Sequence, residues 1–227
     1  RSLSNIQTFV ALSEFSRAKH REFGFLREME VLPQFAPDHG PATDRVEPRP
    51  HDRPYFLCVG RLEPVKGIHD AVSAFAEYSD ADLLIAGEGN SEPSLRAAAN
   101  GNSRCVFLGH VAPDGLRKYY RHAIATLAPS VGAETFGMVL IESFREGTPV
   151  IARRAGPFPE TINSSGGGEL FETRDELLRS LRRLQCDQAY AEKLGESGRA
   201  AYVERWTEER VVPAYIALAE RALALKK

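Results

Sequence analysis

The chain has 227 residues, of which 43% are hydrophobic and 26% charged, and its formal net charge is −2. This is a globular composition with enough apolar material for a core, and the length suits one full domain with extra pieces. The near-neutral charge gives no general attraction to nucleic acid or to an anionic membrane, and no apolar run has the length of a membrane span.

The 3 cysteines are an odd number and show no CxxC spacing. Cys58 and Cys105 fall in apolar runs, where buried free thiols are expected, and this usage favours a reducing, cytoplasmic setting. The chain begins with Arg1 and shows no signal peptide. We therefore expect a piece of a longer protein.

Residues 1–35 predict a small strand–helix–strand unit made from "TFVALS", "EFSRAKHREFGF" and "EMEVLPQF". One such unit cannot bury a core alone, so it is interpreted as the tail of a domain that lies upstream. Residues 36–53 are rich in proline and charge and are predicted to form a linker.

A domain over residues 54–205 is predicted from short apolar runs that alternate with helical patterns. The predicted strands are 55–59, 82–86, 104–108, 124–128, 149–152 and 168–171, and helices are expected over 67–79, 91–100, 113–123 and 136–147. Strands that are apolar on both faces and separated by helices indicate a doubly wound parallel sheet, which is an α/β fold.

The pattern after Thr173 is entirely helical. Three helices are predicted over 175–185, 188–206 and 207–227, with Thr207 able to cap the last one. We take 206–227 as a separate C-terminal helix.

Ligands of an open parallel sheet bind beyond the carboxyl ends of its strands. Glycines and ionisable groups gather in the segments that follow the strands: Arg61 and Lys66; Gly87, Glu88 and Gly89; Gly109 and His110; Ser130, Glu134 and Gly137; and Arg153, Arg154, Gly156 and Glu160. The sequence therefore predicts a binding site at this edge of the sheet.

Arg61 and Lys66 place two cations on one loop, just before a helix that begins near Gly67. Two cations beside a helix N-terminus suit a diphosphate, because backbone N–H groups and the helix dipole add to their charge. The alternative is a solvated loop with surface ion pairs to Glu63.

Glu134 and Glu142 flank a mostly apolar run. Glu134 is expected in the loop before a helix and Glu142 inside that helix, so they are not a same-face pair and a general acid/base dyad is not indicated. The helical wheel places Glu142 on a flank shared with Arg145 and Glu146, where a solvent-exposed glutamate is the alternative to a ligand-binding one.

Other signals are weaker. The sequence "GEGNSE" lacks one glycine of GxGxxG, and there is neither a P-loop nor a His/Cys cluster at metal-ligand spacing, so no metal and no cofactor are expected. His110 stands alone after its strand and is compatible with a structural role. The basic stretch 179–183 suggests a solvated helix face, and membrane association is not otherwise indicated.

Taken in order, these segments resemble the C-terminal, donor-binding domain of a retaining glycosyltransferase of family four, with the GT-B architecture. The resemblance runs from about residue 9 to about 218. It is carried by "VALSEFSRAKHREFGF…MEVLPQF", "VGRLEPVKG", "LLIAGEG", "FLGHV" and "PSVGAETFGMVLIESFREGTPVIARRAGPFPETI", the last with its Glu-x7-Glu pair.

The resemblance implies a role for individual residues of this chain. Arg61 and Lys66 would hold the diphosphate of a nucleotide-sugar as it leaves, Glu142 would accept hydrogen bonds from the ribose, and Glu134 would contact the donor sugar as a third catalytic residue. The implied donor-binding residues are Gly60, Gly87, Gly89, His110, Val111, Phe136, Gly137, Met138, Val139 and Glu142. The implied reaction needs no metal clamp, and the implied partners are a nucleotide-sugar donor and an unspecified acceptor.

The sequence departs from the family pattern in three ways, and two other functions compete with the one that the resemblance implies. "ESFREG" replaces a run of small residues, "RRAGPFPE" carries Ala155 and Phe158, and the acceptor domain is absent, so the chain alone is expected to bind donor but to transfer sugar poorly. A nucleotide-sugar 2-epimerase and a non-catalytic nucleotide-binding module are the competing hypotheses.

Overall fold

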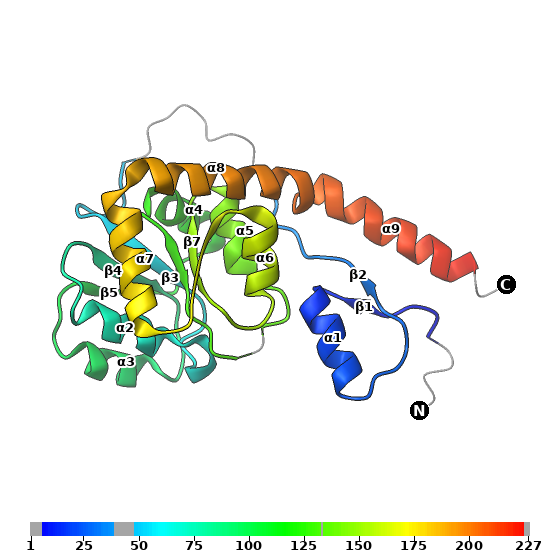
Figure 1. Ribbon diagram of the computed structural model, residues 1–227, viewed down its shortest axis with the longest axis horizontal. Helices are drawn as coiled ribbons and strands as arrows, with labels where there is room; N and C mark the ends of the chain where they lie inside the picture. The colour runs from blue at the N-terminus through cyan, green and yellow to red at the C-terminus, as the bar shows by residue number, and fades with distance from the viewer. Residues whose placement is uncertain (1–5, 39–47, 133, 225–227) are drawn as a thin grey trace.

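The computed structural model describes residues 6–38, 48–132 and 134–224 of the chain. Its main body is a six-stranded parallel sheet in the order β5-β4-β3-β6-β7-β8, covered by helices on both faces (Figure 1). This confirms the predicted α/β fold. The strands are β3 Tyr55–Val59, β4 Asp82–Ala86, β5 Cys105–Gly109, β6 Thr126–Ala128, β7 Val150–Arg153 and β8 Gly168–Phe171.

Side chains of successive strand residues enter opposite faces of this sheet, as the strand pleat requires. Along β3, Phe56 and Cys58 join the cluster beneath α2, α3 and α7, whereas Tyr55 and Leu57 pack beneath α4. The helices are α2 Ile68–Phe75, α3 Glu92–Ala99, α4 Pro113–His122, α5 Met138–Arg145, α6 Phe158–Ser165, α7 Arg174–Cys186 and α8 Gln188–Arg205. Cys58 and Cys105 are buried free thiols, as predicted.

The strand order contains one reversal of direction. From β3 the chain adds β4 and β5 on one side, then returns to place β6 against the other side of β3 before adding β7 and β8. After β3 the chain continues toward one edge of the sheet, and after β6 it continues toward the other edge. In open parallel sheets a crevice forms between two such neighbouring strands, so we expect a ligand beyond Val59 and Ala128, at the carboxyl ends of β3 and β6.

The sequence analysis missed α6, which lies between β7 and β8. Pro157 and Pro159 made this segment resemble a loop, but both fall at the start of the helix, where proline is tolerated because the first N–H groups have no intrahelical acceptor. The other helices and strands fall where they were predicted, with ends shifted by a few residues.

The N-terminal unit has the predicted strand–helix–strand form. β1 Val10–Ala11 pairs in parallel with β2 Glu30–Val31, and α1 Glu14–Glu22 connects them. Phe23 and Leu26 are 83% and 81% exposed, so the unit buries little apolar surface of its own.

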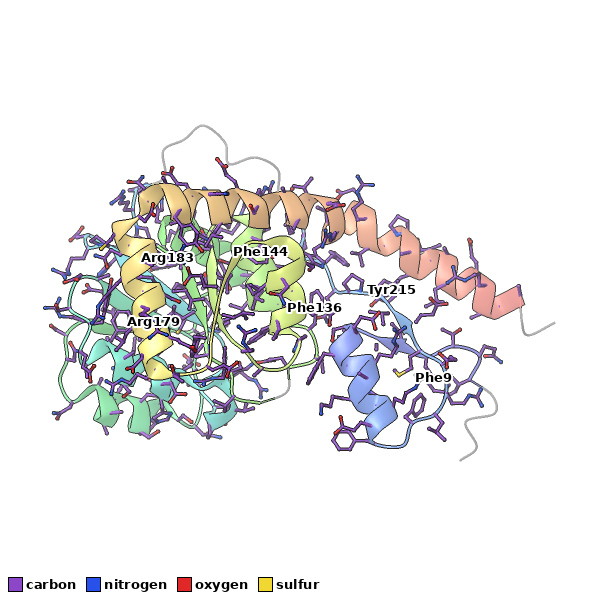
Figure 2. All side chains as sticks on the ribbon, in the orientation of Figure 1. Phe9, Phe136, Phe144, Arg179, Arg183 and Tyr215 are labelled. Carbon is purple, nitrogen blue, oxygen red and sulfur yellow. The ribbon has the colours of Figure 1, made fainter. Side chains whose placement is uncertain are left out.

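The last helix, α9 Glu208–Ala224, lies along this N-terminal unit (Figures 1 and 2). The Tyr215 hydroxyl donates to the Leu32 carbonyl at 3.1 Å, and Arg221 pairs with Glu30 at 3.3 Å. Half of the predicted linker, residues 39–47, lies outside the described residues, and the predicted domain boundaries stay predictions.

One flank of α5 faces α4 through a cluster of charges. The Glu146 side chain is only 2% exposed and accepts from Arg117 at 2.8 Å, Arg121 at 2.7 Å and Arg145 at 3.1 Å. The solvent-exposed alternative for this flank is therefore wrong, because the helical wheel shows which residues share a face but not which helix covers it. We call Glu146 and these three arginines the α4–α5 charge cluster.

The Glu146→Gln variant should lose about 3 kcal/mol of unfolding free energy at pH 7, because the substitution leaves buried cations without their carboxylate. Burial alone would raise the pKa of Glu146, but hydrogen bonds from Arg117 and Arg121 and the charge of Arg145 outweigh it and hold the pKa below 4.5. A lowered folded-state pKa contributes stability that is complete above the unfolded value and is lost as the pH falls through the folded one.

The difference between wild type and Glu146→Gln should therefore shrink below about pH 4.5, as urea unfolding at a series of pH values would show. Glu92→Gln is the matched control, because its partner Arg96 is 55% exposed and an exposed pair of this kind contributes about 0.5 kcal/mol or less. An equal loss in the two variants would contradict a structural role for the charge cluster.

Candidate functional site

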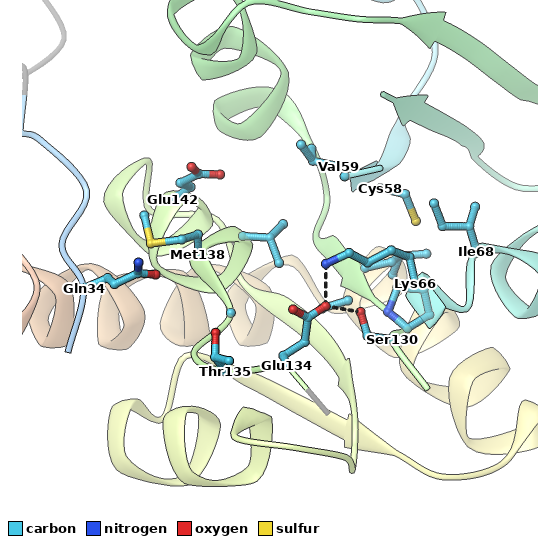
Figure 3. Close-up of a pocket in the computed structure, with 16 residues that line it drawn as sticks. Gln34, Cys58, Val59, Lys66, Ile68, Ser130, Glu134, Thr135, Met138 and Glu142 are labelled. Carbon is cyan, nitrogen blue, oxygen red and sulfur yellow. Dashed lines mark hydrogen bonds and ion pairs between the residues drawn. The ribbon is translucent and has the colours of Figure 1, made fainter. Parts of the chain in front are cut away.

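Two adjoining cavities lie at the carboxyl ends of the central strands. The first, of about 290 Å³, opens between the ends of β3 and β6 (Figure 3). The second, of about 310 Å³, lies beside it at the ends of β3, β4 and β5, and both are lined by Val59 and Gly60. We call them the central cavity and the side cavity.

Most of the predicted site residues line these two cavities. Gly60, Lys66, Glu134, Gly137, Met138, Val139 and Glu142 line the central cavity. Gly60, Arg61, Gly87, His110 and Val111 line the side cavity. The segments that follow four strands, β3, β4, β5 and β6, thus meet where the sheet topology places a ligand crevice.

Two predicted residues line neither cavity. Gly89 lies against the backbone of Leu62, where an added Cβ would come within 2.5 Å of the Leu62 carbonyl oxygen. The Phe136 side chain is buried at 5% exposure in the core beneath α5 and α6. These two positions have packing roles in the structure.

Lys66 and Glu134 form an ion pair across the central cavity (Figure 3). The Lys66 Nζ lies 2.5 Å from Glu134 Oε1, and the buried Ser130 hydroxyl donates to the same oxygen at 2.8 Å. Both charged side chains remain about a quarter exposed, at 25% and 23%, so solvent and ligand can reach them. The alternative of a surface pair between the lysine and Glu63 is not what the structure contains.

Arg61 lies at the mouth of the side cavity. Its residue is exposed, and within the part of the chain that the structure describes it forms no ion pair. One cation of the predicted pair is therefore compensated by Glu134 and the other is available to an anion.

The N-terminus of α5 faces the central cavity. The helix starts at Met138, directly after Gly137, and its first backbone N–H groups have no acceptor within the helix. The helix dipole adds partial positive charge at this end. Together with Lys66 and Arg61, it gives the crevice the electrostatic character of an anion site.

Glu142 enters the central cavity one turn further along α5. Its Oε2 accepts from the hydroxyl of Tyr120 on α4 at 2.7 Å. Glu134 comes from the loop before the helix, so the two carboxylates reach one cavity from different elements, as the sequence indicated. The solvated alternative for Glu142 does not hold, because its side chain is half-buried and hydrogen-bonded.

The loops after β3 and β6 are packed tightly against each other. The Val131 backbone N–H donates to the Val65 carbonyl at 2.9 Å. Gly67 has φ +64° between Lys66 and α2, and an added Cβ there would lie 2.1 Å from the Pro129 carbonyl oxygen. Glycine is required at this position, and its presence lets the lysine loop approach the glutamate loop.

The side cavity is lined mainly by apolar groups, including Val59, Ala86, Val111, Pro113 and Leu116. His110 is exposed at its rim, and its backbone N–H donates to Glu88 at 3.3 Å. A mainly apolar cavity of this volume can accommodate a planar ring.

The sequence analysis did not identify three residues that bear on the site. Gln34 and Thr135 line the central cavity, and Tyr120 binds Glu142. Ser130, which binds Glu134, was named among the polar residues that follow the strands but was given no role. Nothing in the sequence connects Gln34 or Tyr120 with the site, because both arrive through tertiary packing.

Over the described residues, no group of three or more His, Cys, Asp or Glu side chains is arranged to hold a metal ion. No helix in the described part of the chain is long and apolar enough to cross a membrane.

A parallel α/β sheet with an anion site and two carboxylates at its topological switch point defines a nucleotide-binding class of fold. Residues 41–201 match the family "Glycosyl transferases group 1", and the chain belongs to this family. The fold is that of GT-B glycosyltransferases, so the resemblance to family four drawn from the sequence is confirmed.

Particular relatives share much of the chain. A GDP-mannose-dependent alpha-(1-6)-phosphatidylinositol monomannoside mannosyltransferase of Mycobacterium tuberculosis is 29% identical over 89% of this chain and 58% of its own length. Sucrose-phosphate synthase from Thermosynechococcus elongatus superposes with a TM-score of 0.84, at 26% identity over 95% of this chain and 58% of that one. The chain thus spans a little over half the length of these two relatives.

A third similar structure is HepE from Anabaena, solved in complex with UDP-glucose. It has a TM-score of 0.83 at 20% identity, over 96% of this chain and 64% of that one. At this identity the likeness concerns the fold.

The Gly67→Ala variant should lose about 3 kcal/mol of unfolding free energy, because it adds a collision with Pro129 to the cost of about 1 kcal/mol for a left-handed backbone. Gly147→Ala is the matched control: Gly147 has φ +75° but nothing within 4 Å of an added Cβ. Thermal and urea unfolding of both variants would measure the difference. Equal losses would show that the contact between the two loops adds no constraint.

Proposed function

We propose that this chain is the donor-binding part of a retaining glycosyltransferase that transfers a sugar from a nucleoside-diphosphate sugar to an acceptor. The observation that carries the proposal is the convergence of Lys66, Glu134 and Glu142 on one crevice beside the α5 N-terminus. Membership of a glycosyltransferase family supports the class of reaction.

In this proposal the diphosphate lies between Arg61, Lys66 and the N-terminus of α5. Two side-chain cations and a helix N-terminus meet the charge of two phosphate groups without further compensation. The nucleobase occupies the apolar side cavity, and Glu142 accepts from the ribose. Glu134 accepts from the hydroxyls of the donor sugar, since it lines the central cavity and not the side cavity.

Arrival of the donor changes the partner of Lys66. Without ligand the ammonium group is held by Glu134, and a diphosphate is a more highly charged competitor for it. When Lys66 turns to the phosphates, the Glu134 carboxylate becomes available to the sugar, and Ser130 continues to hold it in the cavity.

The proposed chemistry breaks the bond between the anomeric carbon and the phosphate oxygen. The electron pair passes to the diphosphate, the acceptor hydroxyl attacks the same face of the sugar, and its proton passes to the departing phosphate oxygen. Arg61 and Lys66 stabilise the charge that develops on the diphosphate, which is the largest electrostatic contribution such a site can make. In this scheme Arg61 and Lys66 neutralise the charge of the leaving diphosphate, a role that a metal ion fills in other enzymes.

The names of the relatives indicate a class of donor but not its base or its sugar. The mycobacterial relative uses GDP-mannose, and HepE is solved with UDP-glucose, so a hexose on a nucleoside diphosphate is the proposed donor class. The acceptor is left open, and a cytoplasmic location is the proposed setting for such a donor.

Calorimetric titration of this chain with UDP, GDP, ADP and TDP tests the proposal, with and without Mg²⁺. One nucleotide should bind in a metal-independent manner, and Arg61→Ala should weaken it about tenfold or more, as expected for loss of a charge-assisted hydrogen bond. Arg179→Ala is the matched control, because that side chain is 67% exposed on α7 (Figure 2). No binding by any nucleotide would favour a non-catalytic module of another kind.

The exchange of Lys66 between Glu134 and the diphosphate predicts that one site substitution increases the affinity for the free nucleoside diphosphate. Glu134→Gln should bind the free nucleoside diphosphate about two- to fivefold more tightly, because removal of an ion pair frees Lys66. The matching nucleotide-sugar should not share this gain, since its sugar loses the carboxylate. Isothermal titration calorimetry with both ligands measures this difference. Lys66→Ala is the control and should bind both ligands more weakly. Weaker binding of the free diphosphate by Glu134→Gln would contradict the exchange.

A further inference from the structure

Glu142 has one protein partner among the described residues, and that partner is buried. The Tyr120 side chain on α4 is 1% exposed, and its hydroxyl donates to Glu142 Oε2 at 2.7 Å. No other hydrogen-bond donor of the described chain reaches this carboxylate. Glu142 Oε1 is therefore the oxygen without a protein partner in a side chain that lines the central cavity.

The phenol is a dependable donor. Burial raises the pKa of Tyr120 well above its ordinary value, and the nearby charge of Glu142 and the hydrogen bond to it raise the pKa further. The hydroxyl of Tyr120 is therefore a hydrogen-bond donor to the Glu142 carboxylate at neutral pH.

The backbones that carry these two residues are fixed to each other. The Tyr120 carbonyl accepts from the Thr148 hydroxyl at 2.7 Å, just after the end of α5. One turn beyond Glu142, Glu146 joins α5 to Arg117 and Arg121 of α4 through the α4–α5 charge cluster. Separation of α4 from α5, which would carry the phenol away from Glu142, would break these ionic contacts.

We propose that Tyr120 is a positioning residue for nucleotide recognition: it occupies Oε2 of Glu142 and so turns Oε1 toward the ribose of the donor. The inference rests on the proposed function, because it concerns the same site. A carboxylate on an aliphatic side chain otherwise loses rotational freedom when the ligand binds, and that loss weakens binding. Tyr120 removes this freedom before the ligand arrives.

The consequence is specific to the ribose. A contact that only holds the fold together would change the affinity for all nucleotides equally, whereas a residue that orients Glu142 changes the preference for ribose over deoxyribose. The ratio of these two affinities is therefore the readout that separates positioning from stability.

The test is a calorimetric titration with the nucleoside diphosphate that binds best and with its 2′-deoxy and 3′-deoxy counterparts. Wild type should prefer the ribonucleotide by about tenfold over at least one deoxy form, as for a hydrogen bond to a charged group. Glu142→Gln should abolish most of this preference, and Tyr120→Phe should reduce it at least about threefold.

Tyr55→Phe is the matched control. The Tyr55 side chain is also 1% exposed, and its hydroxyl also donates to α4, at the Tyr119 carbonyl at 2.9 Å, but it does not touch Glu142. This variant should keep the wild-type preference. If Tyr120→Phe is unfolded under the assay conditions, the same titrations are made in the cold with sucrose, which favours the folded state.

The outcomes are distinct. If wild type binds no nucleoside diphosphate, the proposed function fails and this inference fails with it. If the ribose preference disappears in Glu142→Gln but is intact in Tyr120→Phe, the positioning role is overturned and the proposed function stands. A preference lost in both, with Tyr55→Phe unchanged, supports the positioning role.

Discussion

The pairing of β3 with β6 is the constraint on which the rest of the structure depends. These strands are adjacent in the sheet although two other strands separate them along the chain. Beyond their carboxyl ends the chain continues toward opposite edges of the sheet, and the lysine loop and the glutamate loop that follow these strands pack against each other. Lys66 and Glu134, 68 positions apart, meet at 2.5 Å only because the register of these two strands brings them there.

The helices extend this constraint from the sheet to the ligand groups. α5 starts at the edge of the central cavity, and its flank toward α4 carries both Glu142 and Glu146. Residues four apart share a helix face, so the buried charge cluster that fixes α5 also fixes the carboxylate one turn nearer the ligand. A buried charge cluster and the carboxylate proposed to recognise the ribose therefore share one face of α5.

The sequence made the sheet and the location of the site predictable, because both depend on local patterns. Apolar runs marked the strands, and polar residues after them marked the edge. Lys66, Glu134 and Glu142, which were chosen from the sequence alone, line one cavity at that edge. Period and spacing do not show which helix covers which flank. This is why Tyr120 was missed, and why a solvent-exposed flank stayed open as an alternative for Glu142. The helix α6 was missed for a different reason. Proline usually ends a helix, but it is tolerated in the first turn, where α6 has its prolines.

The N-terminal unit is bound to the site at the side where the sugar is proposed to lie. The Ser13 hydroxyl donates to the Thr135 carbonyl at 2.9 Å, next to Glu134. The first backbone N–H groups of α1 donate to the Glu160 carboxylate at 3.1 and 3.0 Å, so a helix from one unit is capped by a side chain from the other. Gln34 of the same unit lines the central cavity. The central cavity is therefore lined by residues from both units, and any movement between the units changes the cavity in which sugar transfer is proposed to occur.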